Sequence, residues 1–318
     1  MKIGDIARLA GVSTTTVSRV LNNSKNVKEE TRIKVNNVIK EQNYYPNMIA
    51  RNLSSNKNDT IGLIVPDIKN TYFSKIVNNM VTNAGKKNLN VVLGCSNEDF
   101  EIQKKYIELF IKQRVKGIII AVTKNSYNEL EFFENISSKI PVVFIERKIN
   151  SNFPTVCFEN INSTIKSIEK LIEKGHKKIA FLAGDLSIST ARERLEAYKR
   201  VLKKYNIKYD EKLVFYGDFS MESGYILAKE IFKTNVSAIY ISNNLMLLGF
   251  LKALKEYKKN EDEYLISTFE HDEIVYFINQ DINSYKIPFS ELTKKSMDLL
   301  EEVSNKENKK NLVEIELD

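Results

Sequence analysis

Residues 3–22 read IGDIARLAGVSTTTVSRVLN and are the most informative segment of the chain. Apolar residues recur in this segment at helical spacing on both sides of Gly11. A glycine permits the positive φ that a tight turn between two steeply crossed helices requires. Ser13 follows this turn and can cap the second helix through its hydroxyl group. The segment therefore predicts a helix-turn-helix.

The predicted helices each have an apolar face, and these faces would share one small core. A third helix over about residues 29–42 is expected to close it, because its apolar residues also recur at helical spacing. The expected core residues are Ile6, Ala7, Leu9, Val17, Val20, Leu21, Ile33, Val35, Val38 and Ile39.

The opposite face of the second predicted helix is polar. It carries Thr14, Thr15, Ser18 and Arg19. An arginine can hydrogen-bond a guanine edge through two N–H groups, and hydroxyl groups can reach phosphates or bases. The face is therefore typical of a DNA-recognition helix. The alternative is an ordinary helical hairpin with a solvated face, which a shorter match would favour.

The basic residues of the chain are concentrated at the same end. The 318 residues carry a net charge of +7. Residues 1–59 contain ten Lys and Arg against five Asp and Glu, whereas the other 259 residues contain 38 against 36. A basic module on a nearly neutral body indicates contact with a polyanion at one end. Charge alone does not show whether this polyanion is DNA, RNA or an acidic membrane surface. The helix-turn-helix pattern favours DNA.

From Ile61 onward, apolar runs alternate with amphipathic helical patterns. Runs rich in Ile and Val suit strands that helices cover on both faces, so the alternation predicts parallel, doubly wound α/β sheets. The nine predicted strands are more than one typical sheet contains, so we expect two lobes. A ligand-binding cleft is expected beyond the carboxyl ends of the strands. The predicted strands are Ile61–Val65, Val91–Gly94, Gly117–Val122, Val142–Ile145, Thr155–Phe158, Ile179–Ala183, Leu213–Tyr216, Ala238–Ile241 and Tyr264–Ser267. The predicted helices cover residues 71–87, 99–114, 160–174, 190–205, 221–233 and 244–258.

These features together resemble the LacI/GalR family of transcriptional regulators. The resemblance runs from residue 3 to about residue 270 and is most specific over the first 67 residues. The residues that carry it are DIARLAGVS (Asp5–Ser13), TVSRVLN (Thr16–Asn22), YPN (Tyr45–Asn47), Ala50-Arg51-x-Leu53 and IGLIVPD (Ile61–Asp67).

For the DNA-binding part, the resemblance implies roles for the polar residues at the start of the second helix and on its outer face. Thr14, Thr15 and Arg19 would read the major groove. Ser13, Thr16 and Ser18 would lie near phosphates.

The resemblance also implies that residues 47–54 form a hinge helix when two copies meet on operator DNA. Leu53 would enter a minor-groove base step, with Asn47, Ala50 and Arg51 in the same contact. The alternative for Leu53 is a residue that anchors a linker onto the body. One DNA-binding module of this size binds weakly at physiological salt, so two modules are needed. We therefore expect a homodimer that binds a pseudo-palindromic operator.

For the body, the resemblance implies a periplasmic-binding-protein-like fold whose chain crosses between the lobes three times. The expected organisation is a headpiece at residues 1–46, a hinge and linker at 47–59 and an effector-binding domain at 60–318. Within that domain, the N-lobe would take residues 61–158 and 288–306, and the C-lobe would take residues 159–287 and 307–318.

The expected effector site gathers polar and aromatic residues at strand ends and helix starts. Arg194 matches the family's effector-binding arginine, although an ion pair with Glu193 or Glu196 on its own helix is the alternative. Tyr72 and Phe73 suit stacking on a ring but could equally belong to the core. An arginine, an amide and carboxylates suit a hydroxyl-rich ligand or one carrying an acid. The expected effector-binding residues are Tyr72, Phe73, Glu146, Glu159, Arg194, Asn243 and Glu270. At each of the three glutamate positions the family usually has an aspartate.

The sequence shows no competing catalytic or metal-binding pattern. It contains no G-x-S-x-G elbow, no G-x-x-x-x-G-K loop and no H-E-x-x-H, and Cys95 and Cys157 lack metal-ligand spacing. We therefore expect no enzyme activity, no cofactor and no metal. No apolar run has the length of a signal peptide core or a membrane span, so we expect a cytoplasmic protein without a membrane partner.

The preferred function is a repressor of carbohydrate uptake or catabolism genes that responds to a sugar or sugar derivative. One alternative is a global catabolite-type regulator that responds to a phosphocarrier protein. A solute-binding transport protein is a further alternative, because it shares the fold of the body. That alternative predicts a secretory signal and no headpiece, and the sequence matches neither expectation.

Overall fold

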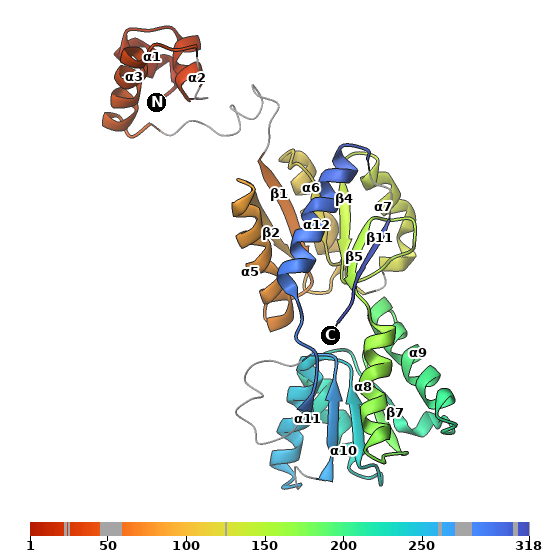
Figure 1. The fold of residues 1–318 in the computed structure, drawn as a ribbon. Helices are drawn as coiled ribbons and strands as arrows, with labels where there is room; N and C mark the ends of the chain where they lie inside the picture. The colour runs from red at the N-terminus through yellow and green to blue at the C-terminus, as the bar shows by residue number, and fades with distance from the viewer. Residues whose placement is uncertain are drawn as a thin grey trace. The chain divides into compact units, whose positions relative to one another are not determined.

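The computed structural model describes residues 1–21, 24, 26–44, 59–124, 126–259, 263–270, 282–307 and 311–317 (Figure 1). The chain divides into two units, Met1–Asn58 and Asp59–Asp318. The predicted hinge residues Asn47, Ala50, Arg51 and Leu53 lie outside the described residues.

The first unit contains three helices, α1 (Ile3–Ala10), α2 (Thr14–Leu21) and α3 (Glu29–Glu41). Gly11 ends α1 with a φ of 63°, in the left-handed region that favours glycine. The Ser13 hydroxyl oxygen accepts a hydrogen bond from the Thr16 N–H at 3.1 Å and caps α2. The predicted helix-turn-helix, its glycine turn and its serine cap are confirmed.

The core of the first unit differs from the prediction at two positions. Leu9 is 50% exposed and Ile33 is 54% exposed, so their predicted core positions were wrong. Successive residues of a helix turn by 100°, which places Leu9 off the face that Ile6 and Ala10 share and places Ile33 opposite Val35. The buried residues of this core are Ile6, Ala7, Ala10, Val17, Val20 and Val35, with Leu21, Val38 and Ile39 partly buried against them.

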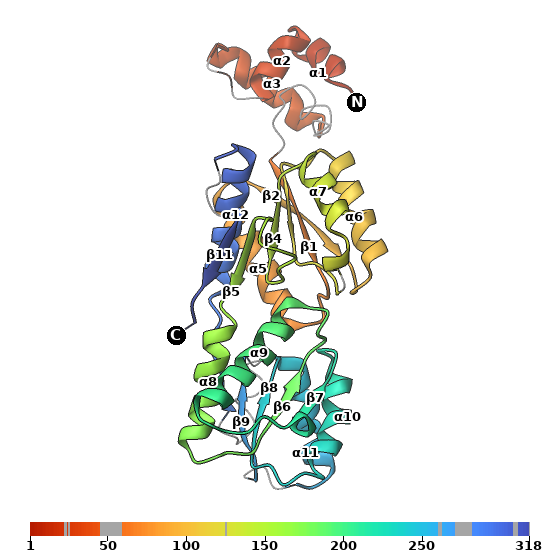
Figure 2. The same cartoon turned by 90° about the vertical axis from the view of Figure 1, so that its right-hand side faces the viewer.

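The N-lobe of the second unit contains a six-stranded parallel sheet in the order β11-β5-β4-β3-β1-β2. Figure 2 shows this sheet between two layers of helices, with α5 and α12 on one face and α6 and α7 on the other. The strands are β1 (Thr60–Val65), β2 (Asn90–Cys95), β3 (Ile118–Ile120), β4 (Val142–Ile145), β5 (Thr155–Phe158) and β11 (Leu312–Ile315). The helices are α5 (Thr71–Lys86), α6 (Phe100–Lys112), α7 (Leu130–Ser137) and α12 (Phe289–Ser304), with a short 3-10 turn, η1 (Ser126–Asn128).

The C-lobe contains a five-stranded parallel sheet in the order β10-β9-β8-β6-β7. Helices α8 and α9 cover one face, and α10 and α11 cover the other. The strands are β6 (Ile179–Ala183), β7 (Val214–Tyr216), β8 (Ala238–Ile241), β9 (Leu265–Thr268) and β10 (Ile282–Asn283). The helices are α8 (Ile161–Glu173), α9 (Ser189–Lys204), α10 (Met221–Ile231) and α11 (Asn244–Glu256), with a 3-10 turn, η2 (Glu211–Leu213).

The predicted architecture of two doubly wound parallel sheets is confirmed. All nine predicted strands are present as β1 to β9, and their ends differ from the prediction by at most two residues. The predicted helices correspond to α5, α6, α8, α9, α10 and α11. The prediction omitted α7, α12, β10 and β11.

The C-terminal segment belongs to the N-lobe, which corrects the predicted organisation of the lobes. Strand β11 pairs in parallel with β5, with Leu312 opposite Thr155 and Ile315 opposite Phe158. Leu317 is buried in the N-lobe core. The assignment of residues 307–318 to the C-lobe was therefore wrong for the described residues 311–317. Within the described chain, two crossings join the lobes, one between β5 and α8 and one between β10 and α12.

Candidate functional site

The outer face of α2 is held in place by the apolar residues beneath it. Val17 is fully buried and Val20 is 3% exposed, which fixes the rotation of the helix about its axis. Thr14, Thr15 and Arg19 are exposed on the other side. The helix therefore exposes two hydroxyl groups and one guanidinium group on the surface of the first unit.

The three residues predicted to contact phosphates lie beside this outer face. Ser13 is exposed, whereas Thr16 and Ser18 are half-buried. The hydroxyl oxygens of Ser13 and Thr16 are hydrogen-bonded to each other at 2.9 Å. Hydroxyl groups at this end of a helix lie where backbone N–H groups and the helix dipole also favour an anion.

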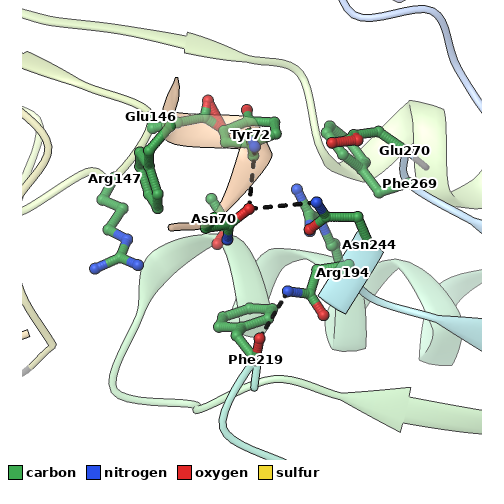
Figure 3. A pocket seen from close by; sticks show the side chains of 12 residues that line it. Asn70, Tyr72, Glu146, Arg147, Arg194, Phe219, Asn244, Phe269 and Glu270 are labelled. Carbon is green, nitrogen blue, oxygen red and sulfur yellow. Dashed lines mark hydrogen bonds between the residues drawn. The ribbon is translucent and has the colours of Figure 1, made fainter. Parts of the chain in front are cut away.

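A pocket in the second unit lies at the carboxyl ends of the strands of both sheets (Figure 3). Its volume is about 490 Å³, including the part that is open to solvent. Its residues follow β1, β4, β7, β8 and β9 or lie in the first turns of α9. The lining residues are Asn70, Tyr72, Phe73, Glu146, Arg147, Thr190, Arg194, Phe219, Asn243, Asn244, Phe269 and Glu270. Six of the seven predicted effector-binding residues are among them.

Glu159 is the predicted residue that does not line this pocket. Its carboxylate oxygens accept hydrogen bonds from the backbone N–H groups of residues 161–163 at 2.8–3.1 Å. The first N–H groups of a helix have no partner within the helix, and a carboxylate there also stabilises the helix dipole. Glu159 thus caps α8 at the first crossing between the lobes.

Arg194 is fixed by the chain itself and is only 5% exposed. Its Nε donates to Asn160 Oδ1 at 3.0 Å, and its Nη1 donates to the Ser242 carbonyl oxygen. The centre of its guanidinium group lies 3.6 Å from the centroid of the Phe269 ring, and both are labelled on the right of Figure 3. These contacts orient the guanidinium group toward the pocket.

The alternative partners of Arg194 are engaged elsewhere. Glu193 binds the Lys148 ammonium group at 2.9 Å and accepts a hydrogen bond from Asn160 at 2.9 Å. Glu196 binds Arg200 at 2.9 Å on the same helix. The predicted alternative, an ion pair between Arg194 and either glutamate, is absent from the described structure.

Arg147 is a pocket residue that the sequence prediction did not include. Its Nη1 and Nη2 donate to the two carboxylate oxygens of Glu98 at 3.0 and 2.7 Å, and Nη1 also donates to the Val122 carbonyl oxygen at 2.7 Å. Its guanidinium group lies 5.5 Å from the centroid of the Phe73 ring. The resemblance to the family offered a signal for Arg147, because Glu146-Arg147 stands where the family usually has an Asp-Arg pair.

The two asparagines Asn70 and Asn244 connect the lobes at the rim of the pocket. Asn70 caps α5 by accepting from the Tyr72 N–H at 3.0 Å. The Asn244 amide group donates to Asn70 Oδ1 at 3.3 Å and to Thr71 Oγ1 at 3.0 Å, as the upper dashed lines of Figure 3 show in part. An asparagine before a helix predicts a cap, but the contact between lobes depends on tertiary structure.

Two pocket residues adopt the left-handed backbone region without being glycine. Glu146 and Phe219 both have a φ of 68°. The Phe219 carbonyl oxygen accepts a hydrogen bond from the Asn243 amide group at 2.9 Å. Such strained residues persist only where the surroundings fix them, and they cluster at binding sites. Nothing in the sequence predicts this conformation for Phe219.

Glu146 is a buried acid of the pocket. It is 4% exposed, and its Oε2 has no hydrogen-bond partner among the described residues. Burial raises the pKa of the Glu146 carboxyl group, although Tyr72 and Arg194 act in the opposite direction. Burial and the Glu146 carboxylate together raise the pKa of the Tyr72 hydroxyl group. The carboxyl group is therefore costly to ionise at this buried position.

We expect Glu146→Gln to increase the thermal midpoint at pH 8, because it removes a buried acid whose folded pKa is raised. The wild-type free energy of unfolding should fall as the pH rises from the unfolded pKa of about 4.3 through the higher folded pKa. The gain should therefore vanish near pH 4, and thermal melts across this range measure it. The surface variant Glu134→Gln on α7 is the control. A gain that is independent of pH would contradict the assignment.

The described residues contain neither a metal-binding cluster nor a membrane-spanning helix. That part of the chain holds no group of three or more His, Cys, Asp or Glu side chains placed to hold a metal ion. None of the helices it contains is long and apolar enough to cross a membrane.

Comparison with known proteins gives matches over both units. Residues 2–47 match the family model of bacterial regulatory proteins of the lacI family. Residues 58–276 match the model of periplasmic binding proteins and the sugar binding domain of the LacI family.

Individual relatives and solved structures match nearly the whole chain. Catabolite control protein A of Streptococcus mutans is 33% identical over 308 residues, which cover 96% of this chain and 92% of the relative. The HTH-type transcriptional repressor PurR of Vibrio atlanticus is 30% identical over 319 residues, which cover 98% of this chain and 95% of the relative. The crystal structure of the Lac repressor dimer bound to operator and the anti-inducer ONPF has a TM-score of 0.89 at 25% identity, covering 100% of this chain and 96% of that one. This chain therefore belongs to the lacI family and is a DNA-binding transcriptional regulator.

Proposed function

We propose that this chain is a sequence-specific repressor of carbohydrate uptake or catabolism genes. It binds a pseudo-palindromic operator as a homodimer, and a sugar or sugar derivative in the pocket between the lobes sets its operator affinity. The observation that carries the proposal is the outer face of α2, where exposed Thr14, Thr15 and Arg19 lie above fully buried Val17. The protein acts in the cytoplasm, where its DNA lies.

The chemistry of α2 supports direct reading of bases. Arg19 can bind guanine through two N–H groups in the major groove, and Thr14 and Thr15 can contact neighbouring base edges. Ser13, Thr16 and Ser18 contact phosphates, which positions the helix without adding sequence information. In the same proposal Leu53 enters the minor groove, with Asn47, Ala50 and Arg51 beside it.

The second unit supports pairing of two copies through the edge of the N-lobe sheet. Strand β2 is one of the two edge strands of this sheet, and its Leu93 is 38% exposed. Val81 on α5, the helix that packs against β2, is 52% exposed. Apolar side chains beside an unpaired strand edge indicate a surface that another chain covers. The Lac repressor, which shares this fold, is a dimer on its operator.

A second candidate function is a global catabolite-type regulator that responds to a phosphocarrier protein. The similarity to catabolite control protein A of Streptococcus mutans favours it. The two candidates differ in what changes operator affinity. If a phosphocarrier protein strengthens operator binding and no small sugar changes it, the second candidate replaces the first.

The salt dependence of operator binding tests the electrostatic part of the proposal. For about six to ten phosphate contacts per dimer, we expect log K against log salt concentration to have a slope of about −5 to −9. Fluorescence anisotropy at a series of salt concentrations measures the slope, with a scrambled duplex as the control. A slope near zero would show that basic residues of the headpiece do not bind phosphates.

A further inference from the structure

The hydrogen-bond donors of the pocket are largely used by the chain itself. Both terminal nitrogens of Arg147 are bound to Glu98. Arg194 donates to Asn160 and to the Ser242 carbonyl oxygen. The amide groups of Asn243 and Asn244 donate to Phe219 and to Asn70, respectively. Most of these donors are thus unavailable to a ligand, although Arg194 retains N–H groups for a ligand hydroxyl.

The acceptors of the pocket differ from the donors, because the charge of one buried carboxylate is only partly offset by its neighbours Tyr72, Arg194 and Arg147. Glu146 Oε2 is buried and has no hydrogen-bond partner among the described residues. Glu270 is a second carboxylate in the lining and is 3% exposed. Figure 3 shows Glu146 beside Tyr72, with Glu270 on the other side of that ring. Glu146 supplies the acceptor for a ligand, and Glu270 only adds negative charge.

We propose that the effector is a hydroxyl-rich small molecule with a protonated amine, such as a hexosamine, and that the ammonium group binds the Glu146 carboxylate. This inference rests on the proposed function, because it assumes that the pocket is the effector site. An ammonium group offers three donors and no acceptor, and its charge offsets that of a buried carboxylate. Phe219 and Tyr72 also line the pocket, and aromatic rings can stabilise a nearby cation.

The same arrangement disfavours ligands that carry an acid or a phosphate. Arg147 is neutralised by the bidentate Glu98 pair and cannot serve an anion without breaking that pair. Arg194 is the other cation of the lining, and an anionic group beside it would still lie near the like charges of Glu146 and Glu270 in a buried site. A neutral hexose would leave Glu146 with a hydroxyl partner, which is a weaker bond than one assisted by charge.

Matched probes test this preference on the full-length protein. Glucosamine, galactosamine and mannosamine are each compared with the parent hexose and its uronic acid by thermal shift and calorimetry at about pH 6.5, where the amine is protonated. We expect at least one hexosamine to bind roughly tenfold or more tightly than its hexose, as a charge-assisted hydrogen bond implies. The uronic acid should bind most weakly. If no hexosamine binds, or if a hexose or uronic acid binds as tightly, the proposal is wrong.

Variants of Glu146 separate the proposed contact from a general effect on the pocket. Glu146→Gln should remove the preference for the hexosamine and retain binding of the parent hexose, whereas Glu146→Asp should retain part of the preference. The control Glu134→Gln removes the same charge from the exposed surface of α7 and should change nothing. A preference that persists in Glu146→Gln would overturn the assignment.

Operator binding of the same preparations distinguishes the two levels of the proposal. Sequence-specific operator binding without any response to a hexosamine would refute the inferred ligand and leave the DNA-binding function intact. Tight hexosamine binding together with equal affinity for all duplexes would support the inferred ligand and refute sequence-specific DNA binding.

Discussion

Arg19→Ala is expected to remove most of the preference for operator over other duplexes. Arg19 is exposed on the outer face of α2, and a bidentate arginine–guanine contact contributes about 1–3 kcal/mol of discrimination per half-site, a factor of about 5 to 150. Binding to scrambled DNA should weaken only slightly, because one charge is lost. Anisotropy titrations of operator and scrambled duplexes measure the two effects separately.

Arg8→Ala is the matched control for this prediction. Arg8 lies in the same small unit on α1 and its side chain is 80% exposed, so the variant removes the same charge away from the recognition face. It should weaken both duplexes by the same small factor. If Arg19→Ala also weakens both duplexes equally, Arg19 binds phosphate and does not read a base.

Arg194→Ala is expected to abolish the effector response while operator affinity without effector is retained. Arg194 lies in the pocket of the second unit, and its guanidinium group joins Asn160, Ser242 and Phe269 around the ligand space. Its loss removes ligand contacts and the link between α9 and the first crossing between the lobes. Operator titrations with and without the sugar or hexosamine that binds the wild-type protein measure the response.

Arg200→Ala on the same helix controls for the loss of a positive charge. Arg200 pairs with Glu196 on the exposed side of α9, where side-chain substitutions have small effects. Its effector response should equal that of the wild type. An Arg194→Ala protein that still responds fully would remove Arg194 from the effector site.

The local parts of the structure could be predicted because their signals are local. The turn at Gly11, the cap at Ser13 and the nine apolar strands each depend on a few neighbouring residues. Errors arose where the phase of a helix decides burial, as at Leu9 and Ile33, because apolar character alone does not fix which face points inward. The helix-turn-helix fold itself did not depend on these two positions.

Tertiary pairing explains what the sequence did not predict. Strand β11 pairs with β5 across more than 150 residues of sequence, so a four-residue strand with three apolar residues could not reveal its partner. Six of the seven expected effector residues line the pocket, because strand ends in parallel sheets lie at one edge. Glu159 follows a strand end too, but the next helix begins immediately and uses its carboxylate as a cap.

The central claim is that two copies of the chain read one duplex through α2. The most direct measurement selects a duplex from a random pool and determines its affinity and stoichiometry by anisotropy and mass photometry at about 150 mM salt. We predict two chains per duplex and an affinity at least about 10³-fold above that for scrambled DNA. Equal affinity for every duplex, or a single chain on each bound duplex, would contradict the claim.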